Sequence, residues 1–128
     1  MKVFIKENSW VARVAAAKMN AGQVAIVFGH TIHLHNTSRD EFLQNTDWLC
    51  HELKHVEQYR EHGFAGFLVK YLWEWMKNGY YHNRFEVEAR ESEKDISLIS
   101  RTEFIKRSTP LLQNQSRSLP VPPGAADE

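Results

Sequence analysis

Two histidines four residues apart, His51 and His55, are the residues whose spacing most directly indicates chemistry. They lie in the segment His51-Glu52-Leu53-Lys54-His55. Residues i and i+4 of an α-helix project from the same face, so two imidazoles at this spacing can bind one metal ion. A catalytic Zn²⁺ site needs a third protein ligand and an open position for water, whose pKa the metal lowers to about 7. Glu52, beside that water, would act as general base, so the segment predicts a hydrolytic zinc site.

Composition and charge restrict the classes of protein that could carry this site. The chain has 128 residues, which suffices for one domain with a single core. Its 16 basic and 16 acidic residues give no net charge, which argues against a general binder of nucleic acid or anionic membranes. With Cys50 as its one cysteine, the chain has no intrachain disulfide and no thiolate zinc site. We interpret Cys50 as a buried packing thiol.

No targeting or membrane segment is evident from the sequence. Residues 1–6 contain neither the apolar run of about 7 to 15 residues nor the small-residue cleavage site of a signal peptide. The most apolar window, residues 64–76, is shorter than the about 20 residues that span a bilayer, and it includes Lys70 and Glu74. We therefore expect a cytoplasmic protein without an integral membrane segment.

The amino-terminal third predicts a strand followed by helices. Residues 2–6 alternate and are rich in Val, Ile and Phe, which favours a strand. A helix follows, with the N-cap types Asn8 and Ser9 before it and Gly22 at its end. Its predicted inward positions are apolar residues at helical spacing: Trp10, Val11, Val14, Ala15 and Met19. Further on, Ser38 and Glu41 fit a capping box that opens a short helix.

A β-hairpin is predicted between these helices. Residues 23–28 and 31–35 form its strands, around the two-residue turn Gly29-His30. The simplest interpretation of the second strand is an edge strand whose polar face carries His33 and His35 in solvent. An edge strand beside a cleft can also pair with an extended peptide, and His33 or His35 would then contact the substrate. Both interpretations remain open.

The motif helix is predicted to begin after a break at residues 45–47 and to end at Gly63. One apolar row runs along it, formed by Leu49, Leu53 and Val56. Glu52 and His55 lie in the adjacent row, which should be partly buried. A buried carboxylate and imidazole need partners, which a metal ion or hydrogen bonds to neighbouring side chains would supply.

The next helix, residues 64–77, carries a broad apolar face that is expected to pack on the core. This face comprises Phe64, Phe67, Leu68, Tyr71, Leu72, Trp75 and Met76. Trp73 lies off this face, so an exposed aromatic patch for a partner or substrate is the alternative. Asn83 then caps a last helix whose inward stripe is Phe85, Ala89, Ser92, Ile96 and Ile99. We expect a domain over residues 1–106 and a flexible Pro/Ser-rich tail over residues 107–128.

The motif helix and the segment Glu86-Val87-Glu88-Ala89-Arg90 together resemble the gluzincin class of zincin metallopeptidases. In that class an HExxH helix is followed by a helix with a Glu-x-x-x-Asp or Glu-x-Glu-Ala-Asp pattern. The resemblance is closer still to small bacterial zincin-like metallopeptidases, and it covers about residues 1–100. It implies Glu86 as the third zinc ligand, with Glu88 and His82 as alternatives.

Glu86 also has two possible roles that involve no metal ion. Glu86 could be the capping-box partner of Asn83, or it could form an i,i+4 ion pair with Arg90 worth about 0.2 to 0.5 kcal/mol. We reject His62 as a ligand, because in a continuous helix it lies about 10 Å beyond His55 along the axis.

The segment also departs from the gluzincin pattern at one position. Arg90 stands where larger gluzincins have an Asp that orients a ligand histidine, so that contact must come from elsewhere or be missing. Tyr80 or Tyr81 would be placed to stabilise an oxyanion.

The sequence thus predicts an α+β, zincin-like domain, in which a small sheet with an edge-strand hairpin packs on about four helices. Zn²⁺ would be held by His51, His55 and Glu86. The predicted function is hydrolysis of peptide bonds in a peptide or protein by metal-activated water, with Glu52 as general base. The alternative is a zinc-binding but catalytically inactive module that binds a protein partner through residues 64–77 or the tail.

Overall fold

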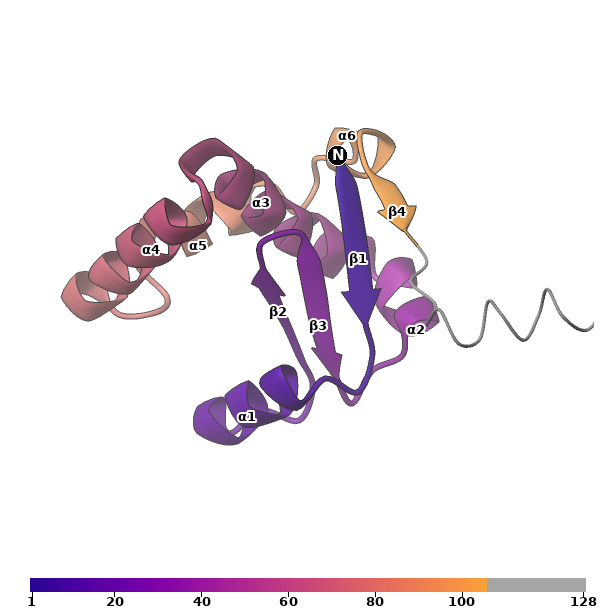
Figure 1. Ribbon diagram of the computed structural model, residues 1–128, viewed down its shortest axis with the longest axis horizontal. Helices are drawn as coiled ribbons and strands as arrows, with labels where there is room; N and C mark the ends of the chain where they lie inside the picture. Colours follow the sequence, from indigo (N-terminus) through magenta and orange to yellow (C-terminus); the bar gives the residue numbers. More distant parts are fainter. Residues whose placement is uncertain (106–128) are drawn as a thin grey trace, which may run out of the picture.

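A four-stranded mixed β-sheet is the scaffold of the protein (Figure 1). The computed structural model describes residues 1–105. The strands are β1 (Lys2–Lys6), β2 (Val24–Phe28), β3 (Thr31–His35) and β4 (Glu103–Ile105). Their order across the sheet is β2-β3-β1-β4, in which β1 pairs in parallel with β3 and β4, and β2 pairs antiparallel with β3.

Six helices occur among residues 1–105, and the predicted α+β class is confirmed. They are α1 (Trp10–Met19), α2 (Arg39–Gln44), α3 (Thr46–His62), α4 (Phe64–Asn78), α5 (Arg84–Glu91) and α6 (Ser97–Ser100). Within the described residues, no helix combines the length and apolar character needed to cross a membrane. The tail predicted for residues 107–128 lies outside the described residues.

The sheet separates two apolar layers of unequal size. The larger core lies between the sheet and α3, where Leu34 of β3 and Leu53 of α3 are fully buried. On the other face, α1 packs Ala12 and Ala16 against Val24 of β2. Neighbouring residues of a strand point to opposite faces, so both layers follow from the alternation along β2 and β3.

The predicted inward face of the first helix is wrong. Trp10 is 64% exposed, whereas Ala12 and Ala16 are buried. The reason is steric, because α1 lies close to the strands and only small side chains fit between them. The helix also ends before Gly22, at Asn20, which takes the left-handed conformation with φ 53°.

The hairpin is confirmed, but its second strand is not an edge strand. Gly29 begins the turn with φ 63°, a conformation that glycine adopts without strain. β3 pairs with β2 on one side and with β1 on the other, where Lys6 lies opposite His33. The edges are β2 and β4. Strand β4 was not predicted, because three residues that pair with β1 from a distance of about 100 positions leave no local alternation to detect.

The carboxyl-terminal helices differ from the prediction in how they pack. α4 has the predicted bounds to within one residue, but it projects away from the sheet and only Phe67 of its apolar face is buried (Figure 1). The last predicted helix stops at Glu91 instead of continuing through Ile96. Ile96 is 70% exposed, and Leu98 of the separate helix α6 enters the core.

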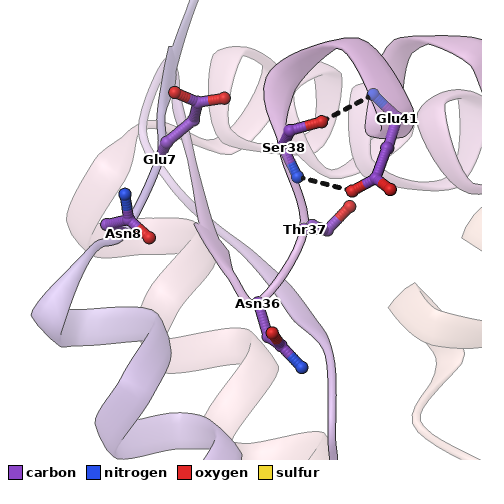
Figure 2. Close-up of a pocket in the computed structure, with 6 residues that line it drawn as sticks. All are labelled: Glu7, Asn8, Asn36, Thr37, Ser38 and Glu41. Atoms are coloured by element: carbon purple, nitrogen blue, oxygen red, sulfur yellow. Dashed lines mark hydrogen bonds between the residues drawn. The ribbon is translucent and has the colours of Figure 1, made fainter.

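A polar pocket lies where β1 and β3 end, and Figure 2 shows its lining. It has a volume of about 310 Å³ and is lined by Glu7, Asn8, Asn36, Thr37, Ser38 and Glu41. The predicted capping box lies here, because Ser38 Oγ accepts from the Glu41 amide and Glu41 Oε1 accepts from the Ser38 amide, both at 3.0 Å. Glu7 accepts from the Arg39 amide at 2.5 Å. Both carboxylates therefore serve to start α2.

Asn83 connects α4 to the start of α5. Its Oδ1 accepts from the Phe85 amide at 2.9 Å, and its Nδ2 donates to the Tyr71 carbonyl oxygen at 3.0 Å. The side chain is fully buried. It therefore fixes the position at which α5 leaves α4.

We expect Asn83→Ala to lower the free energy of unfolding by about 1 to 3 kcal/mol, because it removes the cap of α5 and the side-chain hydrogen bond that ties α5 to the Tyr71 carbonyl. Urea denaturation of the metal-free protein measures this change. Asn78→Ala is the matched control, since Asn78 is exposed and bonds only Glu74 within its own helix among the described residues; its effect should stay within about 0.5 kcal/mol. Equal stability of the two variants would show that Asn83 does not anchor α5.

Candidate metal centre

His51, Glu52 and His55 all lie on helix α3. This helix begins where Asn45 Oδ1 accepts from the Trp48 amide at 3.2 Å, and it ends at Gly63 as predicted. Glu52 and His55 are 6% and 7% exposed, so the row they share is buried as expected. Cys50 of the same helix is fully buried, in agreement with a packing role.

Helix α5 brings Glu86 to the two histidines. Glu86 Oε1 lies 3.0 Å from His51 Nε2 and 3.2 Å from His55 Nε2. Its Oε2 accepts a hydrogen bond from the Tyr71 hydroxyl at 2.5 Å. The carboxylate is 3% exposed and is therefore directed to these partners, which separates it from the surface roles considered above, a capping box and an ion pair with Arg90.

The donor atoms of His51, His55 and Glu86 fit a single metal ion. One ligand atom from each residue lies within 4.8 Å of the others. Two ligands of a tetrahedral ion with bonds of about 2.0 to 2.1 Å are about 3.3 Å apart, close to the separations of Glu86 Oε1 from the two imidazoles. Two neutral imidazoles and one carboxylate form a common set of metal ligands. These three residues could therefore hold a metal ion.

The other ring nitrogen of each histidine is also engaged, which fixes both rings. His51 Nδ1 lies 2.8 Å from Glu93 Oε2, and His55 Nδ1 lies 2.8 Å from Gln58 Oε1. Gln58 donates its Nε2 to the carbonyl oxygen of Phe85, so its Oε1 is the atom that accepts from His55. Both Nδ1 atoms thus donate to these oxygens, and both Nε2 atoms face Glu86.

Glu93 supplies the orienting contact that Arg90 cannot make. It lies three residues beyond Arg90, just after α5. The Arg90 guanidinium instead covers the ring of Tyr81, 4.0 Å from its centroid, and donates to the Tyr81 carbonyl oxygen. Glu93, and not the residue at position 90, is therefore the side chain that orients the His51 ring.

The close carboxylates change the protonation of the histidines. Burial alone would lower the pKa of His51, but the hydrogen bonds to Glu86 and Glu93 and the charge of Glu52 raise it to about 9. The pKa of His55 is also raised, again against the effect of burial and mainly by Glu86. Burial would raise the pKa of Glu86, yet the hydrogen bonds from His51, His55 and Tyr71 hold it well below its usual range. The metal-free site is therefore an ion-paired network at neutral pH.

The pKa of Glu52 is shifted in the opposite direction from that of Glu86. Burial raises the pKa of Glu52 to about 7, even though the charges of His55 and His51 and a hydrogen bond from Trp48 act in the opposite direction. The pKa of Glu52 therefore lies near neutral pH, far above that of Glu86.

Two tyrosines border the centre. Tyr71 was predicted only as part of the apolar face of α4, and its contact with Glu86 was missed. The one available signal was its hydroxyl, which needs a partner when the ring is buried. For Tyr80, burial and the charges of Glu86 and Glu52 raise the pKa, so its hydroxyl keeps its proton at neutral pH.

The remaining candidate ligands lie outside the cluster. His62, rejected from the sequence, packs against Phe67 and Phe85, with ring centroids 6.3 Å and 5.6 Å away. Glu88 accepts from Gln58 at 2.8 Å. His82 packs edge-on against Tyr81.

His33 and His35 lie on the opposite face of the sheet from the metal cluster. They share the α1 side, where His33 Nδ1 is 2.8 Å from Ser9 Oγ, while Ile32 and Leu34 face α3. Because β3 is an interior strand, its backbone is not available to pair with an extended peptide. The predicted edge strand is therefore wrong, and a contact of His33 or His35 with substrate stays a prediction.

A family model matches the amino-terminal part of the chain. Residues 2–63, just under half of the chain, match the family model of the eCIS core domain. This region runs from β1 to the end of α3, so it includes His51, Glu52 and His55 but not Glu86. No curated protein and no solved structure matches the chain significantly. The resemblance to gluzincins is not tested by this match and stays a prediction.

The raised pKa of His51 predicts an unusual pH dependence of metal binding. A metal ion binds the neutral imidazole and must displace its proton, so affinity should rise with pH until the pKa near 9 is passed. We expect zinc affinity to increase about tenfold between pH 7 and pH 8 for each proton displaced. Competition with a chromophoric chelator measures this. If affinity levels off above pH 7, the histidines titrate near their ordinary pKa and the ion-paired network is absent.

The contact between Glu93 and His51 predicts a role in metal affinity. Glu93→Ala should weaken zinc binding by about 10- to 100-fold, because the imidazole loses the partner that fixes its orientation. Glu91→Ala, which removes an exposed carboxylate at the end of α5, is the control and should bind as the wild type does. The same chelator competition, with circular dichroism to confirm folding, compares the two. Unchanged affinity in Glu93→Ala would refute the role of Glu93.

Proposed function

We propose that the protein is a zinc-dependent peptidase whose metal ligands are His51, His55 and Glu86. The observation that supports this most strongly is the convergence of the three donor groups from two helices, with the buried Glu52 lying between the histidines in α3. The set of two imidazoles and one carboxylate suits Zn²⁺ and leaves a fourth position for water. When bound, the ion supplies a Lewis acid that polarises a carbonyl group and acidifies water.

Glu52 is the general base of this proposal. It occupies the same buried row as His55, and its pKa of about 7 lets it accept a proton from water near neutral pH. The same carboxyl group can then deliver that proton to the leaving amine. Glu86, whose pKa is held far lower by three hydrogen bonds, stays ionised and is suited to ligation.

Tyr80 is the better of the two tyrosines predicted to stabilise an oxyanion. It is close enough to Glu86 and Glu52 for their charges to raise its pKa, and it is partly exposed, so substrate can reach it. Its protonated hydroxyl is a hydrogen-bond donor for the negative charge that develops on the carbonyl oxygen. Tyr81 is held against Arg90 instead.

The alternative is a zinc-binding module without catalytic activity. The exposed aromatic side chains of α4 favour it, because such surfaces are typical of protein contacts. The eCIS core domain, named for extracellular contractile injection systems, supports a role in a protein assembly and indicates no reaction. A peptidase and an inactive module are both compatible with that match.

Glu52→Gln distinguishes the two functions. The variant should keep one zinc per chain, while peptide cleavage should fall by about 100-fold or more, because the ligands are intact and the base is lost. Metal content is measured by plasma mass spectrometry, and cleavage by mass spectrometry of a diverse peptide library.

Two further variants serve as controls for this experiment. Glu61→Gln removes an exposed carboxylate of the same helix and should cleave as the wild type does, whereas Glu86→Ala should lose both zinc and activity. A wild type that binds zinc and cleaves no peptide would support the inactive module. Full zinc occupancy in Glu86→Ala would exclude Glu86 from the site.

A further inference from the structure

Helix α4 exposes an apolar surface that no other described residue covers. Six large side chains on it are 43% to 78% exposed: Phe64, Val69, Leu72, Trp73, Trp75 and Met76. We call this set the α4 face. The helix packs against the rest of the protein through Phe67 and Tyr71, and at one edge of the face the Phe64 ring also stacks on Tyr59, with ring centroids 5.5 Å apart. The projection of α4 away from the sheet leaves the face accessible (Figure 1).

The α4 face is continuous and carries no charge. At about 100° per residue, its six members span about half of the helix circumference. Phe64, Leu72 and Met76 lie on one row with i+4 spacing, and Val69 and Trp73 lie on the adjacent row. The lysines of the helix, Lys70 and Lys77, lie just beyond the Trp73 edge of the face.

The size of the α4 face matches that of a protein interface. At the observed exposures, the six side chains present roughly 700 Å², more than the largest apolar patch of about 300 to 600 Å² on a typical monomer. A stable interface buries about 800 Å² per partner. The exposed apolar area of the α4 face is therefore of the same order as the area that a dimer interface buries per partner.

We propose that the α4 face binds the α4 face of a second copy of the chain, forming a two-fold symmetric dimer. A two-fold interface places the same patch on both partners, so a patch without charges is complementary to itself. The i+4 rows of the two helices can interdigitate as ridges and grooves, which crosses the helices at about −50°.

A second copy fits the α4 face better than an anionic membrane does. Membrane-surface helices place cationic side chains beside the apolar face, where they reach the headgroups. Here lysines, Lys70 and Lys77, border only the Trp73 edge of the face, and the chain as a whole has no net charge to attract it to such a surface.

Sedimentation velocity of the full-length protein at micromolar concentration tests the proposal. The molar mass fitted for the wild type should be twice the 15.0 kDa mass of one chain. Leu72→Glu and Met76→Glu should each be monomeric, with unchanged circular dichroism. Each substitution would place one carboxylate from each copy, and therefore two in all, in the apolar interface of the dimer. Lys70→Glu makes a charge change on the same helix outside the face and should remain dimeric.

Three results would overturn the proposal. A monomeric wild type would refute the proposed dimer. Co-sedimentation of that monomer with phosphatidylglycerol vesicles would indicate a membrane as the partner of the α4 face instead. A dimer that persists in both Leu72→Glu and Met76→Glu would place the interface elsewhere. Dissociation of Lys70→Glu to the same extent as Leu72→Glu would show that net charge, and not the α4 face, controls the association.

Discussion

The contact of one Glu86 oxygen with both imidazoles of α3 is the interaction on which the candidate centre depends. A buried carboxylate is costly unless every lone pair has a partner, and here His51, His55 and Tyr71 supply them. The same contact draws α5 and α4 onto α3. Gln58, fully buried, reinforces it by bonding both His55 and the α5 backbone. The centre and the packing of these three helices are therefore one structural unit.

The part of the centre that lies on a single helix was predictable from sequence, and the rest was not. The period of the α-helix places His51 and His55 on one face whatever the remainder of the fold does. Glu86 could be proposed only through a family resemblance, since no local rule joins it to α3. Tyr71 and Glu93 reach the centre through tertiary packing, and an apolar helix face or a charged helix end hides such contacts in the sequence.

The fold shows the same division between local and long-range information. The hairpin and the capping box followed from turn and cap chemistry, which acts over a few residues. The position of β3 inside the sheet depends on its pairing with β1, and the burial of Ala12 in place of Trp10 depends on how closely α1 approaches the strands. Neither leaves a pattern within its own segment. For the same reason the three-residue strand β4 was missed.

The central claim is that His51, His55 and Glu86 bind one zinc ion. Crystals grown with zinc and measured on both sides of the zinc absorption edge would test it most directly, because anomalous scattering locates the metal independently of any assumed ligand. If these three residues hold the ion, one strong peak should lie about 2.0 to 2.2 Å from the Nε2 atoms of both histidines and from a Glu86 oxygen. A zinc peak at other side chains, such as His62 or His82, with none between α3 and α5, would contradict it.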